Sequence, residues 1–157
     1  MNARLNILEN PAIGKAVKHF AAAGKVVQDS PLPVSTQHLV TLRASQINGC
    51  GFCTDMHSKD AVAAGEDWLR LNLVATWREA TCFTEAERAA LELTEQGTRI
   101  ADAAGGVPDE VWENAAKHYD EEQLGALVLL IGIINTFNRL NVLVQQPAGS
   151  YQPGQFA

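Results

Sequence analysis

Two thiols and an imidazole lie within an eight-residue stretch of the 157-residue sequence. Cys50, Cys53 and His57 are separated by three and four residues, a spacing that places all three side chains along one stripe of a helix. Two sulfurs at this spacing can form a disulfide with little backbone movement, and a reversible disulfide allows two-electron redox chemistry. The stretch therefore predicts a redox-active dithiol beside a group that can transfer a proton.

The residues before the first thiol predict a helix end and a new helix start. Asn48 and Gly49 tolerate non-helical backbone, so we expect a break there, with Asn48 capping the next helix and Cys50 in its first turn. Free amide groups and the helix dipole favour a thiolate at that position. His57, if charged, favours a thiolate at Cys53 instead. We favour Cys53 as the attacking thiol and Cys50 as an exposed resolving thiol.

Length and composition indicate one domain that needs no disulfide for stability. The net charge of −6 and the lack of a Lys/Arg cluster argue against nucleic acid as a partner. The longest apolar run, residues 124–134, is about half of a membrane span, so we expect a buried helix and no membrane insertion. Three cysteines and no secretory signal after Met1 predict a cytoplasmic location, where a C-x-x-C motif is more typical of catalysis or metal binding.

Helical periodicity and capping residues predict an all-α fold, since no segment alternates with a period of two. The expected helices cover residues 11–27, 35–47, 50–64, 66–77, 84–103 and 108–119, and a long apolar one follows the cap at 120–123. In the fourth helix we expect Trp68, Leu69 and Leu73 to lie in the core. The sequence thus predicts a compact single-domain bundle of about seven helices over residues 1–148, with a flexible tail at 149–157.

Several stretches of the sequence together resemble one protein family. They are residues 39–50 leading into Cys53 and His57, then 60–61, 65–66, 77–79, 83–91 and 134–140. Over about residues 30–148 the chain resembles the AhpD-like (alkyl hydroperoxidase D) proteins of the carboxymuconolactone decarboxylase superfamily. The resemblance implies a small all-helical homo-oligomer, a trimer or hexamer, that reduces hydroperoxides in antioxidant defence. It also implies that a dithiol or thioredoxin-like partner reduces the cysteine pair again, and that no cofactor is needed.

The resemblance further implies a proton relay made of both cysteines, the following histidine and a glutamate twelve residues before the first cysteine. Cys50, Cys53 and His57 match this pattern, but His38 stands at the position of the glutamate. A histidine can accept a thiol proton near neutrality, so we expect His38 to join the site and to change its pH profile. In the other interpretation, His38 lies on the helix surface and the relay is lost.

Two other functions are compatible with the sequence. A carboxymuconolactone decarboxylase-type enzyme would act on a small lactone, although decarboxylation needs no dithiol. A metal-binding or redox-sensor module would use Cys50, Cys53, His57 and His38 as ligands.

The remaining polar and thiol residues are given structural interpretations. Cys82 is expected to be a lone thiol, and His19 and His118 are expected to be solvated. Asn135, Asn138 and Arg139 interrupt an apolar helix and predict a polar network or a subunit contact.

Overall fold

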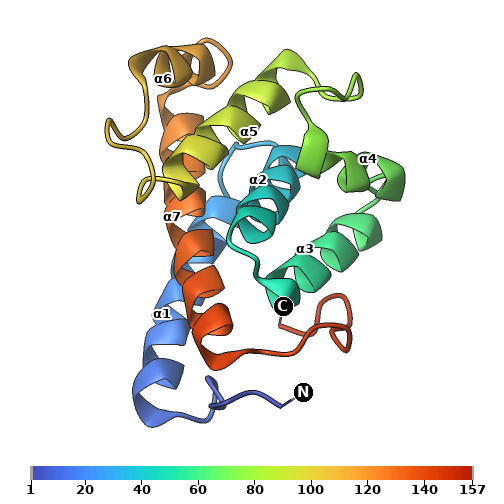
Figure 1. Cartoon of the computed structure of the whole chain (residues 1–157), viewed down its shortest axis with the longest axis vertical. Helices are drawn as coiled ribbons and strands as arrows, with labels where there is room; N and C mark the ends of the chain where they lie inside the picture. The colour runs from blue at the N-terminus through green and yellow to red at the C-terminus, as the bar shows by residue number, and fades with distance from the viewer. Residues whose placement is uncertain (1, 157) are drawn as a thin grey trace.

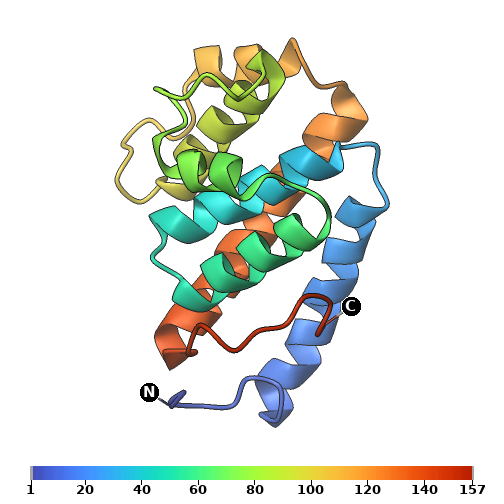
Figure 2. The ribbon, with the colours of Figure 1, turned by 90° about the vertical axis from the view of Figure 1, so that its right-hand side faces the viewer.

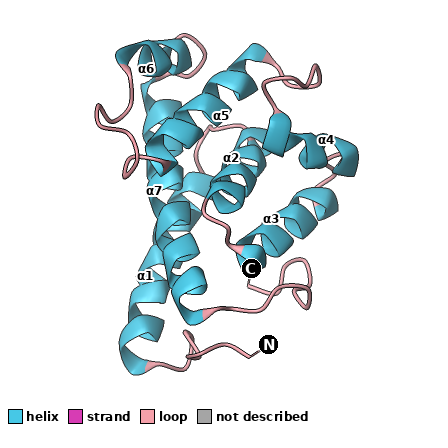
Figure 3. Ribbon diagram, viewed as in Figure 1, coloured by secondary structure: helices cyan, strands magenta, loops and turns pink. Residues whose placement is uncertain are grey.

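The structure is a computed structural model that describes residues 2–156. Over this range the chain forms seven α-helices and one 3-10 helix, and it contains no strand (Figure 3). The predicted all-α fold is therefore confirmed. The elements are α1 (Pro11–Gln28), α2 (Val34–Ile47), α3 (Gly51–Ala63), α4 (Trp68–Asn72), η1 (Leu73–Thr76), α5 (Glu85–Thr98), α6 (Asp109–Ala116) and α7 (Glu121–Val144).

Helix α2 lies at the centre of the fold and packs against α3, α5 and α7 (Figure 1). It contributes to two hydrophobic clusters. Val40 packs with residues of α1, α5, α6 and α7, whereas Leu39 and Leu42 pack with α3, α4 and η1. A helix that is buried on most sides belongs to the interior of the protein. His38, near the start of α2, and the turn that leads from the end of α2 to Cys50 are therefore held by a rigid element.

Helix α7 is the longest element, and α1 runs along it (Figures 1 and 2). By length and composition α7 could cross a membrane, a property that the core helices of soluble proteins share. Leu127 and Ile131 enter the core, but only 39% of that segment is buried. Apolar side chains including Val128 and Leu143 remain exposed, so one chain does not cover the whole apolar surface of α7.

Buried charges tie α2 to the rest of the bundle. The Glu95 carboxylate of α5 accepts hydrogen bonds from Arg43 Nε of α2 at 2.7 Å and from the Trp77 indole at 2.9 Å, and it also pairs with Arg78. Burial alone raises the pKa of Glu95. The hydrogen bonds from these donors together lower it by more than burial raises it, so the pKa lies below the ordinary value. The ionised carboxylate therefore holds α2, α5 and the segment after η1 together.

The expected fourth helix, residues 66–77, is shorter and different in form. Asp67 caps α4, and the chain then tightens into η1. Leu71, Val74 and Trp77 are buried at intervals of three residues, which fit the three-residue turn of a 3-10 helix rather than an α-helix. The prediction that Trp68, Leu69 and Leu73 lie in the core was wrong: Trp68 and Leu69 are 61% and 63% exposed, and Leu73 is exposed as well.

The described part of the C-terminal tail, residues 149–156, lies against α3, and its expected flexibility stays a prediction. The Tyr151 hydroxyl donates to both Asp60 oxygens at 2.8 and 2.9 Å, and its ring is buried. Lys59 Nζ donates to the Gly149 and Tyr151 carbonyls, and Asp55 accepts the Gly149 amide at 2.8 Å. The tail thus supplies hydrogen bonds and an aromatic side chain to the outer face of α3, which composition alone did not indicate.

Candidate functional site

Cys50 and Cys53 form a disulfide with a Cα–Cα distance of 5.3 Å. Cys50 is the N-cap of α3, one residue before the first turn in which we expected it, and its Sγ accepts the backbone N–H of Cys53 at 3.2 Å. This sulfur occupies the position that a capping oxygen takes in most helices. A thiolate on Cys50 would therefore receive an amide hydrogen bond and the favourable end of the helix dipole.

The turn before Cys50 depends on two neighbouring residues. Gly49 has φ = 65°, a left-handed conformation that favours glycine, and the Cys50 amide donates back to the Ser45 carbonyl at 3.0 Å. Asn48 does not cap α3 as expected. Its Nδ2 instead donates to the Oδ1 atoms of Asn135 and Asn138 on α7, each at 2.9 Å. The start of α3 is thus fixed to α7.

The asparagines of α7 form the polar network that the sequence predicted. Asn138 Nδ2 donates to Ser45 Oγ at 3.1 Å, and Asn135 Nδ2 donates to Thr98 Oγ1 at 3.1 Å. Arg139 donates to Asn135 Oδ1 at 3.1 Å. Because Asn135 and Asn138 are buried, these partners satisfy groups that would otherwise destabilise the core. The network holds α2, α5 and α7 in one arrangement around the dithiol.

Sequence reasoning missed a third asparagine on the same helix. Asn141 Nδ2 lies 3.5 Å from Cys53 Sγ and also donates to the Phe137 carbonyl at 3.0 Å. The available signal was the three-residue spacing of Asn135, Asn138 and Asn141 on an apolar helix. That spacing indicates neighbouring positions on α7, but only the packing of α3 against α7 brings Asn141 to a sulfur.

Both sulfurs are shielded from solvent. Cys50 is 2% exposed and Cys53 is 1% exposed, so the prediction of an exposed resolving Cys50 was wrong. The segment before the tail lies close to the first residue of α3, since Ala148 Cβ lies 3.6 Å from the position that a Cβ on Gly51 would take. The ring of Phe52 also packs edge-on against Tyr151, with centroids 6.4 Å apart.

Two histidines, one on α2 and one on α3, interact with each other electrostatically. His57 follows Cys53 by one turn of α3, and it is close enough to His38 of α2 for the two charges to interact. Each ring has a buried Nε2 atom with no hydrogen-bond partner among the protein groups of residues 2–156. His38 is therefore not a solvated surface residue. An unpaired buried nitrogen is unusual and is free to exchange a proton with a nearby group.

The pKa values of both rings favour the neutral form. Burial lowers the pKa of His57 to about 4, against the opposing charge of Asp60 and with a further lowering by His38. Burial also lowers the pKa of His38, opposed by Glu66 and Asp60. At neutral pH His57 is therefore uncharged, and it does not favour a thiolate at Cys53 as a cation, which corrects the expectation from sequence. It is instead able to act as a base.

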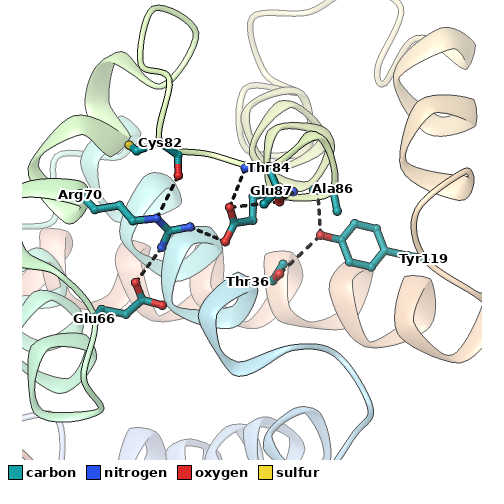
Figure 4. Close-up of polar contacts among 8 residues, drawn as sticks. All are labelled: Thr36, Glu66, Arg70, Cys82, Thr84, Ala86, Glu87 and Tyr119. Atoms are coloured by element: carbon teal, nitrogen blue, oxygen red, sulfur yellow. Dashed lines mark hydrogen bonds and ion pairs between the residues drawn. The ribbon is translucent and has the colours of Figure 1, made fainter.

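The carboxylates near His38 are held by other residues. Arg70 Nη1 donates to Glu66 Oε2 at 2.7 Å, and Arg70 also pairs with Glu87 (Figure 4). Glu87 completes the capping box of α5 by accepting the Thr84 amide at 2.9 Å. Glu66 therefore approaches His38 as the partner of an arginine and is not a free base. Neither Glu66 nor Asp60 was identified as a neighbour of the site from sequence.

Other candidate residues lie away from this site or on the surface. Cys82 is an exposed free thiol, and His19 and His118 are exposed, as expected. Among residues 2–156, no group of three or more His, Cys, Asp or Glu side chains is placed to hold a metal ion. The structure therefore gives no support to the alternative of a metal site built from two cysteines and two histidines.

The profile of the carboxymuconolactone decarboxylase family matches residues 11–96, more than half of the chain. The uncharacterized protein YdfG of Bacillus subtilis is 40% identical over 126 residues, which cover 80% of this chain and 84% of YdfG. The chain therefore belongs to the carboxymuconolactone decarboxylase family, and the resemblance noted in its sequence is confirmed.

Solved structures agree with this assignment. A protein of unknown function from Agrobacterium tumefaciens, suggested to be the antioxidant defence protein AhpD, is 37% identical with a TM-score of 0.87, covering 96% of this chain and all of its own. The debrominase Bmp8 in complex with 2,3,4-tribromopyrrole is 20% identical with a TM-score of 0.78, covering 90% of this chain and 73% of Bmp8. At that identity Bmp8 shows a shared fold only.

Proposed function

We propose that this protein is a thiol-dependent hydroperoxidase or disulfide reductase of the peroxiredoxin type, in which the Cys50–Cys53 dithiol reduces the substrate and a dithiol partner then reduces the resulting disulfide. The observation that carries the proposal is the Cys50–Cys53 disulfide at the N-terminus of α3, beside the unpaired Nε2 atoms of two histidines. Thiols that exchange with a disulfide need a stabilised thiolate and a proton acceptor. This site contains groups suited to both tasks.

The reaction takes two electrons from the two thiols. The Cys53 thiolate attacks one oxygen of the hydroperoxide, the O–O bond breaks, and the sulfur becomes a sulfenic acid while the alkoxide leaves and takes a proton as the alcohol. The Cys50 thiol then attacks the sulfenic sulfur, forming the disulfide and releasing water. A dithiol or thioredoxin-like partner supplies two electrons and two protons to restore both thiols.

The histidines are the proton carriers in this proposal. Neutral His57, one turn after Cys53, accepts the thiol proton, and His38 serves as the second proton acceptor of the relay. His38 then replaces the glutamate that the family resemblance implies. Because burial lowers the pKa of both rings, their basic forms persist below the ordinary histidine pKa of 6.5.

A turnover assay tests the proposed function. Reduced protein should consume an organic hydroperoxide in the presence of a small dithiol, and the alcohol and oxidised dithiol should form in equal amounts. A lactone decarboxylase would instead release carbon dioxide from its substrate and would keep its activity after both cysteines are replaced. No peroxide consumption above the rate of the dithiol alone would contradict the proposal.

Variants of His38 separate a working relay from a lost one. We expect His38→Ala to lower peroxide turnover by about 10²-fold, the lower end of what a positioned proton-transfer group contributes. His38→Glu should retain most of the activity, because a carboxylate at this position can also accept the proton. The control is His118→Ala, since His118 is exposed on the surface. Turnover measured across pH 5–9 should be unchanged in the control, and an unchanged rate in His38→Ala would exclude His38 from the relay.

We also propose a homo-oligomer of three or more subunits in the cytoplasm. Val128, Leu129, Val142 and Leu143 of α7 are exposed, and apolar surface of this kind is commonly covered by another subunit. Light scattering at micromolar concentration should give the mass of a trimer or hexamer, and Leu143→Lys should lower that mass. A monomer in the unmodified protein would contradict this proposal.

A further inference from the structure

Asn141 is a polar residue that reaches a sulfur of the dithiol. It stands three residues before the end of α7, and its Nδ2 lies 3.5 Å from Cys53 Sγ. Asn135 and Asn138 of the same helix serve the junction between α2 and α3, since both accept a hydrogen bond from Asn48. Asn141 differs from them because its contact is with an atom that changes its bonds during the reaction.

The orientation of the Asn141 amide is fixed by its second contact. Its NH₂ group donates to the Phe137 carbonyl at 3.0 Å, and a carbonyl can only accept. The nitrogen, not the oxygen, therefore faces α3, and its other hydrogen is available to Cys53 Sγ. Asn48 holds α7 against the start of α3, so the donor is in place before the sulfur becomes charged.

The two sulfurs thus have separate hydrogen-bond donors. Cys50 Sγ accepts the Cys53 backbone N–H at the N-terminus of α3, whereas Cys53 Sγ is contacted by Asn141. Both sulfurs are buried, and burial without a donor raises the pKa of a thiol. His57 is uncharged at neutral pH and offers no positive charge to Cys53. A thiolate on Cys53 therefore depends on a side-chain donor.

We propose that Asn141 is a catalytic residue that donates a hydrogen bond to the Cys53 thiolate and keeps this sulfur ionised for attack on the peroxide. The same contact stabilises Cys53 as the leaving thiolate when a reductant thiolate attacks Cys50, the S–S bond breaks, and its electron pair passes to Cys53. The role in turnover rests on the proposed function. The effect on the ionisation of Cys53 does not require it.

The test measures the ionisation of each thiol separately. In a Cys50→Ser, Cys82→Ser background, Cys53 is the only thiol, and the ultraviolet absorbance of its thiolate is followed against pH, with a variant lacking all cysteines as the blank. We expect Asn141→Leu, which is similar in size but has no donor, to raise the pKa of Cys53 by about one, leaving about tenfold less thiolate at lower pH. Asn141→Ala should act in the same direction without adding bulk.

The matched control is the other thiol of the same protein. In a Cys53→Ser, Cys82→Ser background, Asn141→Leu should leave the pKa of Cys50 within about 0.3 of its value, because Asn141 does not contact that sulfur. General loosening of the fold would move both values together. An unchanged pKa for Cys53, or equal changes at both thiols, would overturn the proposal. A shifted Cys53 pKa in a protein that consumes no peroxide would leave this inference intact and reject the proposed function.

Discussion

Replacing either Cys50 or Cys53 with serine is expected to lower hydroperoxide turnover by at least about 100-fold. One thiol alone can be oxidised to a sulfenic acid, but it cannot close the disulfide that a dithiol partner reopens. The two thiols act as one unit, so the double variant should be no slower than either single variant. The measurement is steady-state consumption of an organic hydroperoxide with a small dithiol in excess.

Cys82 provides the matched control for this experiment, since it is a free, exposed thiol outside the site. Cys82→Ser should turn over peroxide at the rate of the unmodified protein. Turnover that survives the loss of both Cys50 and Cys53 would show that the dithiol is not the reactive group.

His57, a half-buried histidine whose Nε2 atom is fully buried, is expected to make the fold sensitive to acid. In the unfolded chain a histidine titrates near pH 6.5, whereas in the folded protein burial lowers the pKa of His57 to about 4. Between these values the unfolded state binds a proton that the folded state does not, so stability falls as pH drops from about 6.5 to about 4. A difference of this size corresponds to a loss of up to about 3 kcal/mol.

The measurement is the free energy of unfolding by urea at pH 7 and at about pH 4.5. His57→Gln, which cannot titrate, should lose less stability between these conditions than the unmodified protein, and the two proteins should differ by about 2–3 kcal/mol in that loss. His118→Gln is the control, because His118 is exposed. If the unmodified protein and His57→Gln lost stability equally, His57 would not be held in its neutral form by burial.

Features that depend on neighbouring residues could be predicted from the sequence. Asn10 caps α1 by accepting the Ala12 and Ile13 amides, and Thr84 and Asp120 begin the capping boxes of α5 and α7, as their sequences indicate. Each cap is completed within four residues of chain. The three-residue spacing of Cys50 and Cys53 is also a feature of neighbouring residues, and it predicted that both thiols lie at the start of one helix, as they do in α3.

Features that depend on how helices meet could not be predicted in this way. Trp68 and Leu69 are apolar, but they lie in the short helix α4, which buries Leu71 and leaves both of them in solvent. Asn141 carries no local sign of its contact with Cys53, which exists only because α7 packs on α3. Tyr151 is buried against α3, where its hydroxyl donates a hydrogen bond to Asp60, 91 residues earlier in the chain. Burial likewise keeps the His57 ring neutral, whereas sequence reasoning considered it as a cation.

The most direct test of the redox site is a thiol count on fully reduced protein before and after one equivalent of hydroperoxide. Three thiols should be titrated before the addition and one after it, and mass spectrometry should identify the remaining thiol as Cys82 and the new bond as Cys50–Cys53. The amount of peroxide consumed should equal the amount of disulfide formed. Three free thiols after the addition, with the peroxide unchanged, would contradict a peroxidase role for this dithiol.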